Sequence, residues 1–552
     1  MSQSGKSYGV AVLRGVYVLL CSAMLLFVME TQAQAQSMPT RHMRQEVISG
    51  EARFLNRLPA TQSLRLNIAL PLRNESELDD LLQELYDPQS PSFHQFLSVQ
   101  EFTERFGPTE EDYAAVIRFA RQNGLTVTGT SPNRMVVDVT GSVADIERAF
   151  HVNMGVYQHP TEERPFYAPD QEPTPDLPFP LWHITGLDNF SIPHPASLRR
   201  APEAKGGTTG SGPSGYFIGS DMRAAYYGSG SLTGKGQSVG LVEFAGYNIA
   251  DVNNYFTKVK QTNAVTVTGV STDGSSLSCT KHCDDTEQVL DIEVAISMAP
   301  GMSQVRVYVS DTSDVSIFNK MATENISKSL SCSWGWSPAD PTSDDPIFKE
   351  FATQGQNLFV ASGDSGAYRN GSRYVYPADD AYVTSVGGTD LTTSSAGGPW
   401  KSETAWSYSG GGISPNNIAI PSYQTASGVI TTANKGSKTL RNSPDVAAEA
   451  NTDNYICYDG TCAGGWGGTS FAAPRWAGYL ALVNQQSVAH GKSTVGFINP
   501  TIYPLGLGSS YSSDFHDIIS GSNGTYSAVT GYDLVTGWGS PNGTGLINAL
   551  AP

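Results

Sequence analysis

A serine that follows a glycine turn is the first candidate for chemistry in this chain. Gly468, Thr469 and Ser470 precede the run Phe-Ala-Ala-Pro, and small apolar residues continuing to Ala481 predict a helix that begins beside the serine. A hydroxyl exposed there lies in the positive end of the helix dipole, which suits a nucleophile. The alternative is an ordinary N-cap serine, which prefers the same position. The pattern therefore predicts either a nucleophile or a helix cap.

The Gly-Thr-Ser sequence resembles the nucleophile motif of subtilisin-like serine peptidases, which need a histidine base earlier in the chain. Between residue 215 and Ser470 the only histidine is His282, and its Thr-Lys-His-Cys context lacks the expected His-Gly-Thr pattern. His490 and His516 follow the serine. If Ser470 is activated, we therefore expect its base to be a carboxylate.

Glu287 and Asp291 are the best pair of carboxylates for that role. They are spaced four residues apart in the stretch 284–300, which predicts a helix. The same helical face carries the apolar residues Val294, Ala295 and Met298. Two acids that face a packed interior repel each other, so their pKa values should split, as a base and its partner require. The alternative, a solvated acidic first turn, suits Asp284 and Asp285 better than Asp291.

Ser470, Glu287 and Asp291 together resemble the sedolisins, the serine-carboxyl peptidases made as pro-kumamolisin-type precursors. The resemblance implies that Ser470 is the nucleophile, Glu287 its base and Asp291 the partner of Glu287. It also implies an oxyanion role for Asp364, which follows the apolar run 358–360 in a Ser-Gly-Asp-Ser-Gly turn. An aspartate donates a hydrogen bond to an oxyanion only when it is protonated, so this role requires acid pH. Taken alone, Asp364 fits an ordinary Asx turn.

Two further residues match family positions that extend the hydrogen-bond network behind the catalytic pair. Glu243 ends the apolar run 239–243, which predicts a buried strand, and Trp334 follows a similar segment. A glutamate at a strand end and a tryptophan in a core are also common without any catalytic role. The extended network is therefore an expectation that rests on the resemblance.

The resemblance also implies a calcium site near the C-terminus. Asp517 and Asp533 match its carboxylates, and Ile518, Val529 and Gly531 match its carbonyl donors. Hard oxygen ligands of this kind suit Ca²⁺, although the spacing alone is not that of an EF-hand loop. We therefore expect one structural Ca²⁺ ion.

Composition and the N-terminus predict an exported protein. The chain has 552 residues, with 34 Lys and Arg against 52 Asp and Glu, a net charge of −18 that argues against nucleic-acid binding. Lys6 and Arg14 precede the apolar stretch 15–29 and the small-residue site Ala33-Gln34-Ala35. This pattern predicts a signal peptide over residues 1–35 and hence secretion. No later stretch reaches membrane-spanning length, and we expect a monomer without membrane attachment.

The remaining cysteines fit an oxidising compartment. Cys279 with Cys283, and Cys457 with Cys462, are close enough in sequence for small disulfide loops. Their spacing near His282 also allows zinc, which export makes the poorer interpretation.

The region between the signal and a glycine-rich linker has its own organisation. Alternating strands and amphipathic helices predict a ferredoxin-like α+β domain, with strands at 63–70, 125–128 and 135–139 and helices at 77–86, 110–122 and 143–150. The segment resembles a sedolisin propeptide, which acts as an intramolecular chaperone and inhibitor. We predict a propeptide over 36–192, an exposed linker with the maturation site over 193–212, and a catalytic domain over 213–552.

In the last region strands and helices alternate, which predicts a subtilisin-like α/β domain with a doubly wound parallel sheet. The sequence therefore predicts a secreted, acid-acting endopeptidase that hydrolyses peptides or unfolded proteins, is inhibited by its own propeptide and processes itself. The alternatives are a tripeptidyl-type aminopeptidase on the same scaffold and a catalytically inactive secreted binding protein.

Overall fold

The structure is a computed structural model. It describes residues 40–196, 198–201, 209–279, 284–337, 339, 341–369, 372 and 374–552. The predicted signal peptide, Cys283 and residues 202–208 of the predicted linker lie outside these ranges. Residues Ala35–Pro552 belong to one compact unit.

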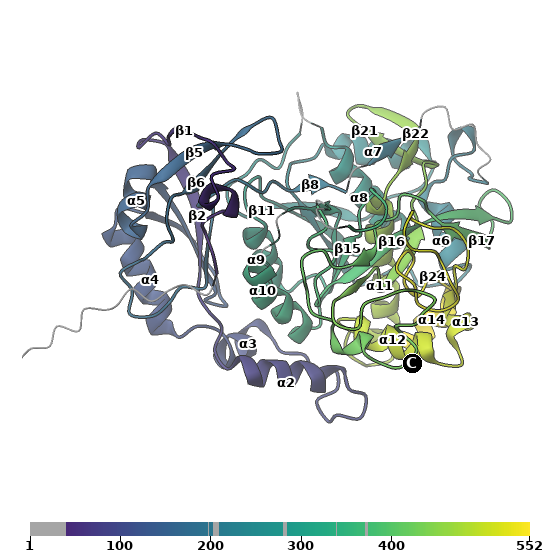
Figure 1. The fold of residues 1–552 in the computed structure, drawn as a ribbon. Coiled ribbons are helices and arrows are strands. Elements are labelled where there is room, and N and C mark those ends of the chain that lie inside the picture. The colour runs from purple at the N-terminus through teal and green to yellow at the C-terminus, as the bar shows by residue number, and fades with distance from the viewer. Residues whose placement is uncertain are drawn as a thin grey trace, which may run out of the picture. The chain divides into compact units, whose positions relative to one another are not determined.

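The propeptide contains the βαββαβ order of a ferredoxin-like domain, as the sequence predicts (Figure 1). Its four-stranded sheet has the order β3-β4-β2-β7, and every neighbouring pair is antiparallel. The elements are β2 (Ser63–Ala69), α4 (Glu110–Gln122), β3 (Thr126–Thr130), β4 (Val136–Ser142), α5 (Val143–Phe150) and β7 (His183–Thr185). Thr109 and Ser142 cap the two helices through their side chains, and the apolar helix faces cover the sheet, with Val116 and Ile146 fully buried.

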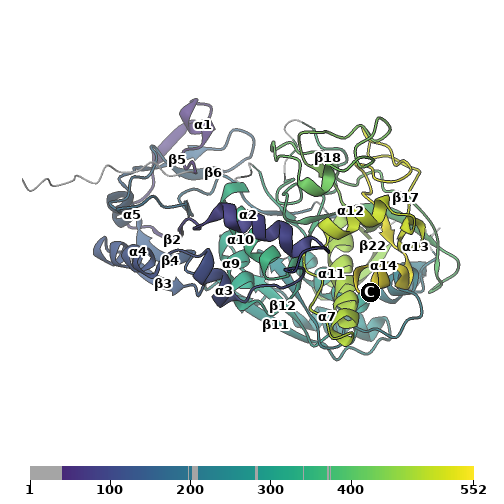
Figure 2. The same cartoon turned by 90° about the horizontal axis from the view of Figure 1, so that it is seen from below.

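Further elements extend this domain. A second sheet, β1-β5-β6, and helices α1, α2 and α3 are added to the ferredoxin-like order. Their bounds are α1 (Gln45–Ile48), β1 (Phe54–Arg57), α2 (Glu75–Tyr86), α3 (Val99–Arg105), β5 (Met154–Gln158) and β6 (Pro165–Pro169). Helix α2 lies along α10 (Pro341–Thr353) of the catalytic domain (Figure 2). The Tyr86 hydroxyl there donates to the Ala352 carbonyl at 2.6 Å.

The catalytic domain is built on a sheet of order β11-β12-β10-β13-β15-β16-β17, with β20 beside β16. All neighbouring pairs are parallel except β16 with β17, which confirms the predicted doubly wound architecture. The strands are β10 (Ser238–Glu243), β11 (Thr266–Ser271), β12 (Gln304–Val309), β13 (Ser329–Cys332), β15 (Asn357–Ala361), β16 (Thr384–Thr393), β17 (Trp400–Ala405) and β20 (Val446–Glu449).

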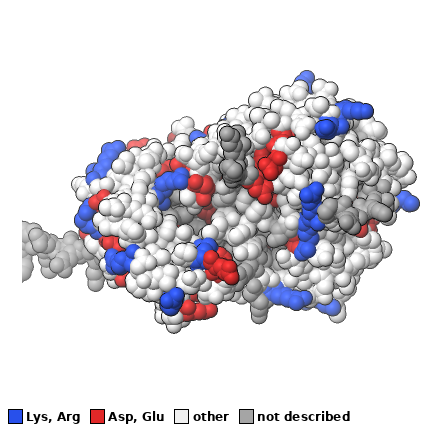
Figure 3. Space-filling model, turned by 90° about the horizontal axis from the view of Figure 1, so that it is seen from above, with Lys and Arg blue, Asp and Glu red and all other residues white. Residues whose placement is uncertain are grey.

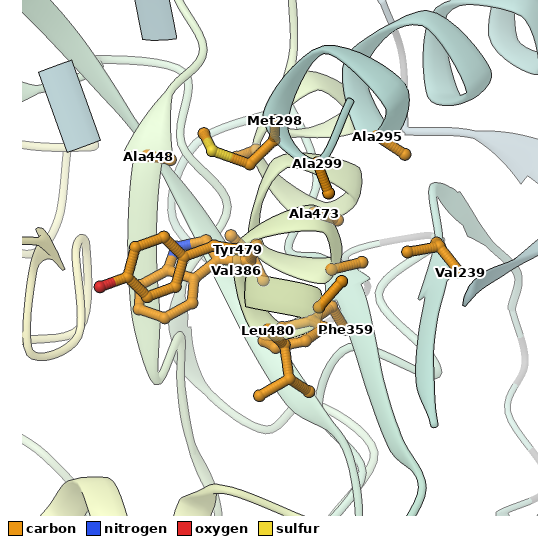
Figure 4. Packing of buried hydrophobic residues seen from close by; sticks show 14 of the residues in the cluster. Val239, Ala295, Met298, Ala299, Phe359, Val386, Ala448, Ala473, Tyr479 and Leu480 are labelled. Atoms are coloured by element: carbon orange, nitrogen blue, oxygen red, sulfur yellow. The ribbon is translucent and has the colours of Figure 1, made fainter. Parts of the chain in front are cut away.

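Helices cover both faces of this sheet because its strands are apolar on both sides. On β15, Phe359 and Ala361 pack with α8 (Thr286–Met298) and α11 (Thr469–Ala489). The alternate residues Leu358 and Val360 pack with α9 (Asp314–Glu324) and α10. Figure 4 shows the first of these layers, in which Ala295 and Met298 of α8 lie over Ala473 and Leu480 of α11.

The other elements of the catalytic domain lie around these layers. Their bounds are η1 (Pro213–Gly215), α6 (Gly219–Tyr226), α7 (Ile249–Lys258), β14 (Trp334–Gly335), β18 (Gly412–Ile413), η2 (Ser422–Gln424), β19 (Asn442–Ser443), β21 (Asn454–Tyr458), β22 (Thr461–Gly467), α12 (Asn499–Leu507), α13 (Tyr511–Asp514), β23 (Phe515–His516), β24 (Ser540–Pro541) and α14 (Gly543–Leu550).

The prediction that the linker is exposed throughout is wrong for its described first part. Strand β8 (His194–Pro195) pairs antiparallel with β14, and β9 (Arg199–Arg200) pairs antiparallel with β22. Both catalytic-domain strands offer backbone groups that an extended chain can satisfy. The linker therefore enters the catalytic domain as an added strand.

The surface is sparsely charged. On the face shown in Figure 3, acidic and basic side chains form small separate groups in a mostly uncharged surface. None of the helices in the described ranges has the length and apolar character that crossing a bilayer requires.

Candidate active site

Ser470 lies in the first turn of α11, as predicted, but its side chain is not exposed. The residue is fully buried, and Leu198 of the linker lies close to Gly468, two residues before it. A β-carbon added at Gly468 would come within 3.1 Å of Leu198 Cδ2 and 2.6 Å of Asp364 Oδ2. Glycine at this position thus makes room for both the bound chain and the acid.

Glu287 and Asp291 both lie on α8, which packs directly against α11. They are 3% and 0% exposed, so the alternative of a solvated acidic turn is wrong for them. Burial raises the pKa of Glu287 well above its usual range, and the charge of Asp291 adds to this effect. Burial likewise raises the pKa of Asp291, together with the charge of Glu243. Both carboxyls therefore stay protonated at pH values at which a carboxyl in water is ionised.

The serine and its predicted base are adjacent, but their contact falls outside normal hydrogen-bond geometry. Interaction with the Ser470 hydroxyl lowers the pKa of Glu287, against the larger effect of burial. Within the described part of the chain, Ser470 Oγ and both carboxyl oxygens of Glu287 have no hydrogen-bond partner. Catalytic hydrogen bonds are often long until substrate binds, so this geometry is compatible with proton transfer.

Asp364 follows β15 and faces the first turn of α11. Its Oδ1 accepts hydrogen bonds from Thr469 N at 2.7 Å and Thr469 Oγ1 at 2.8 Å. Among the described residues its Oδ2 has no partner. Burial raises the pKa of Asp364 to about 7, against the opposing effect of the two Thr469 bonds. An acid with that pKa is protonated in acid solution and can donate from Oδ2.

The predicted network behind the pair is present as contacts. Trp334 Nε1 donates to Glu243 Oε2 at 3.0 Å, and burial followed by the charge of Glu287 raises the pKa of Glu243 well above its usual range. Ser333, which the sequence reasoning missed, donates from Oγ to Asp291 Oδ1 at 2.9 Å. Its only signal in the sequence is its position between the end of β13 and Trp334.

Two cavities flank the site. One of about 200 Å³ is lined by Asp364, Tyr368 and Val375 and is reached by Ala196 of the linker. The other, of about 540 Å³, is lined by Glu287, Trp334 and Trp466 together with His194 of the linker. Both adjoin catalytic groups and residues of the linker.

The cysteine predictions are confirmed where the structure describes them. Cys457 and Cys462 form a disulfide, and Cys332 is a free, buried thiol whose Sγ lies 3.5 Å from the Trp334 carbonyl oxygen. Cys279 is disulfide-bonded, and its predicted partner Cys283 lies outside the described residues.

The predicted calcium ligands are brought together by one loop. Gly531 N donates to both oxygens of Asp517 at 3.2 Å, and Val529 N donates to Asp533 Oδ2 at 3.0 Å. The described residues contain no cluster of three or more histidine, cysteine or acidic side chains that suits a metal ion, so a cation here depends on carbonyl oxygens. Those of Ile518, Val529 and Gly531 accept no backbone hydrogen bond from the described residues. An all-oxygen donor set of this kind fits Ca²⁺.

Comparisons with known proteins agree with this arrangement. Residues 51–190 match the family described as Pro-kumamolisin, activation domain, and residues 311–495 match the Subtilase family. Kumamolisin from Bacillus sp. (strain MN-32) is 30% identical, over 92% of this chain and 97% of its own length. Sedolisin from Pseudomonas sp. (strain 101) is 29% identical, over 90% and 88%. Tripeptidyl-peptidase 1 from Canis lupus familiaris is 27% identical, over 90% and 93%.

A solved structure is also similar. Pseudomonas sedolisin, a serine-carboxyl proteinase complexed with pseudo-iodotyrostatin, matches with a TM-score of 0.53 and 28% identity, over 62% of this chain and 98% of that one. Fold and comparisons together define a serine-type peptidase whose subtilisin-like domain follows an activation domain. The chain belongs to the sedolisin family of such enzymes and carries the family's propeptide.

Proposed function

We propose that this protein is a secreted serine-carboxyl endopeptidase that works in acid and removes its own propeptide. The observation that carries the proposal is the burial of Glu287 and Asp291 on α8 directly against the helix that begins at Ser470. The buried Glu287 carboxyl beside this serine is the group that we assign to take its proton.

In the proposed mechanism Ser470 Oγ attacks the substrate carbonyl carbon while Glu287 accepts the hydroxyl proton. Glu287 then gives that proton to the departing amine, and a water molecule hydrolyses the acyl-enzyme by the same route. Asp291, held by Ser333, shares the charge that Glu287 gains and loses. Protonated Asp364 Oδ2 and the Ser470 N–H donate to the oxyanion.

An acid working range follows from the same groups. Asp364 must keep its proton in order to donate, and burial raises its pKa to about 7. Glu287 must be able to accept a proton, so activity should also decline at the lowest pH. The intact set of candidate catalytic groups argues against the alternative of an inactive secreted binding protein.

Endopeptidase action is favoured over tripeptidyl release by the course of the linker. If the bound linker is aligned as a substrate that is cut after Ala196, His194 is the third residue before the cut bond. The chain then continues through Pro193 to Ile192, which is 37% exposed. A tripeptidyl-peptidase needs an acid that captures a free amine at this point. Asp284 lines the cavity beside His194, but its Oδ1 already accepts two hydrogen bonds from Thr286.

Export and calcium complete the proposal. Residues 1–35 have the pattern of a signal peptide. Asp517, Asp533 and the carbonyls of Ile518, Val529 and Gly531 would hold one Ca²⁺, which would neutralise the two carboxylates and brace the C-terminal loop.

The test begins with purified precursor moved from neutral to acid pH. Wild type should lose roughly 150–180 residues, the size of one small domain with its linker, and then digest an unfolded protein. The Ser470→Ala precursor should stay full length, whereas the control Ser487→Ala, in the same helix, should mature. An N-terminally acetylated peptide should be cut by an endopeptidase and spared by a tripeptidyl-peptidase. Maturation of Ser470→Ala on its own at the wild-type rate would refute self-processing.

A further inference from the structure

The linker crosses the active site as an extended strand that is bound on both sides of Ser470. Before the crossing, His194 pairs with Gly335, and the Ala196 N–H donates to the Ser333 carbonyl at 3.0 Å. After it, Arg200 pairs with Trp466, and the Ala201 N–H donates to the Gly465 carbonyl at 2.8 Å. Antiparallel pairing at both ends fixes the register of the chain across the nucleophile.

Ala196 is the residue that this register brings to the catalytic groups. It is bonded to the backbone of Ser333, whose side chain holds Asp291. It also lines the cavity that Asp364 lines. Leu198 already lies beyond the serine, against Phe471 and Ile456. From these two contacts we infer that the Ala196 carbonyl is the one presented to Ser470. Ser197, which follows it, lies outside the described residues.

Beyond the crossing, two arginines of the linker lie against aromatic rings. The Arg199 guanidinium carbon lies 3.6 Å from the centre of the Tyr408 ring. Arg199 Nε and Nη2 also donate to the Asp364 carbonyl at 3.1 and 2.9 Å. Arg200 lies 5.4 Å from the Trp466 ring and 6.0 Å from the Tyr458 ring. A planar cation stacked on an aromatic face while donating to a carbonyl is a specific arrangement that a neutral side chain cannot reproduce.

These rings lie ready for a ligand. Tyr408 is 45% exposed even with the linker bound. Among the described residues, the buried Trp466 Nε1 has no hydrogen-bond partner, and Trp466 lines the cavity that Glu287 lines. Aromatic side chains that stay partly exposed beside a catalytic serine are typical of a recognition surface.

We propose that the leaving-group side of this cleft recognises arginine, with a main guanidinium site formed by Tyr408 and the Asp364 carbonyl and a weaker one formed by Trp466 and Tyr458. The proposal rests on the proposed peptidase function. It assigns the first maturation cut to the bond after Ala196. Preferred substrates then carry arginine at the third residue after the cut bond, with a smaller preference at the fourth.

The cut itself follows the mechanism given above. The bond from Ser470 Oγ to the Ala196 carbonyl carbon forms, and the bond from that carbon to the nitrogen of residue 197 breaks. The serine proton passes through Glu287 to the departing amine. Water then releases Ala196 as a carboxylate, so no further reactant is required.

The register is tested on the full-length precursor at acid pH by sequencing the earliest new N-terminus. It should be residue 197, and an earliest N-terminus at any other residue overturns the assignment.

Recognition is tested with mature enzyme and peptides that are identical except for arginine, citrulline or alanine at the third residue after the cut. Citrulline keeps the planar shape of arginine, its Nε–H and one NH₂ group, but it has a carbonyl oxygen in place of the other NH₂ group and lacks the charge. We expect kcat/KM to fall about fivefold or more from arginine to alanine, with citrulline between them. Tyr408→Leu should move the arginine-to-alanine ratio toward one, whereas Val488→Ala, an exposed position on α11, should leave the ratio unchanged. Equal cleavage of all three peptides overturns the arginine site.

A binding measurement separates this proposal from the catalytic one. Ser470→Ala protein whose propeptide has been removed by an added, unrelated protease that cuts in the linker should bind the peptide Ser-Leu-Arg-Arg-Ala more tightly than Ser-Leu-Ala-Arg-Ala, by fluorescence titration. If no peptide is cut by wild type, the proposed function fails while this difference still supports the guanidinium site. Equal affinities refute the site whatever the enzyme cleaves.

Discussion

Thr469 donates two hydrogen bonds to a single oxygen of Asp364, from its backbone nitrogen and from its hydroxyl. Both bonds end on Oδ1, so the proton of the acid form belongs on Oδ2. That atom faces Gly468, where a β-carbon would come within 2.6 Å of it. The residue before the nucleophile therefore orients the acid and also fixes which oxygen can donate to a substrate.

This orientation predicts how an amide would behave at the same position. In Asp364→Asn the amide oxygen can accept both Thr469 bonds while the NH₂ group occupies the place of protonated Oδ2. Wild-type activity should fall as pH rises through the pKa of Asp364, about 7 in the precursor, because the donor loses its proton. The asparagine donor does not titrate, so its activity should fall less steeply over that range.

The matched comparison is Asp364→Ala, which should lower kcat by roughly 10²–10³-fold, the usual cost of one oxyanion donor. Both variants are compared with wild type by their initial rates on one peptide from pH 3 to 8. A wild-type maximum at neutral or alkaline pH, or an asparagine profile that parallels wild type, contradicts the assigned role.

Glu243 offers a second test of coupled carboxyls. Its charge raises the pKa of Asp291, after the larger effect of burial. Glu243→Gln keeps the shape and an acceptor for Trp334 but removes one of three buried acids that compete for charge. We expect the acid limb of the kcat/KM profile to move to lower pH, with an order-of-magnitude loss at most in the maximum. Trp334→Phe should move that limb in the same direction but less far, since loss of the Trp334 bond raises the pKa of Glu243 and leaves that carboxyl uncharged over more of the pH range. Limbs that stay fixed in both variants argue for a purely structural role.

Calcium should act on stability. Removal of a bound ion costs about 2.7 kcal/mol when the free ion stands at 100 times its Kd. A chelator should therefore lower the Tm of wild type, and Asp517→Asn should lower it and abolish the response to added Ca²⁺. Asp459→Asn, an exposed acid away from the loop, is the control that should keep the response. A Tm unaffected by chelator removes the calcium proposal.

The parts of this site that depend on local sequence could be predicted. Helical periodicity places Glu287 and Asp291 on one face, and the glycine turn places Ser470 at a helix start, because both relations involve only a few residues. The same holds for the βαββαβ order of the propeptide, which follows from alternating strands and helices.

Relations that depend on the sheet order could not be predicted. Ser333 follows β13 and Asp291 lies on α8, and the two meet only because of the order of the strands, in which β13 lies beside β10. No local pattern in the sequence marks that serine. The linker binds through backbone groups of Ser333 and Gly465, which leave no trace in side-chain chemistry. The sequence also suggests an exposed Ser470, whereas the residue is buried in the folded precursor.

The last prediction concerns how acid loosens the propeptide. Arg65 of the propeptide pairs with Asp273 at 3.1 Å and with Asp311 at 2.9 Å in the catalytic domain. Burial opposes ionisation of Asp273, but hydrogen bonds from Ser275, Ser310 and Thr312 outweigh it and lower its pKa. These hydrogen bonds lie within the catalytic domain and keep Asp273 ionised below its ordinary pKa of 3.8, so its ion pair with Arg65 persists until pH falls through the lowered value.

Arg65→Ala should therefore weaken propeptide binding at neutral and mildly acid pH and have less effect as pH falls below the lowered pKa of Asp273, where wild type loses this ion pair. Because Arg65 is 39% exposed, solvent screens both pairs, and together they contribute about 1 kcal/mol, or roughly fivefold in the displaced fraction. The half-time of precursor maturation, followed by gel from pH 7 to pH 3, should shorten by about that factor at pH 5, and its difference from wild type should narrow toward the lowest pH. Arg53→Ala, an exposed propeptide arginine, should mature like wild type throughout. If Arg65→Ala instead shortens the half-time equally at every pH, the ion pairs are not what acid releases, and loss of the Arg65 side chain has merely destabilised the propeptide fold.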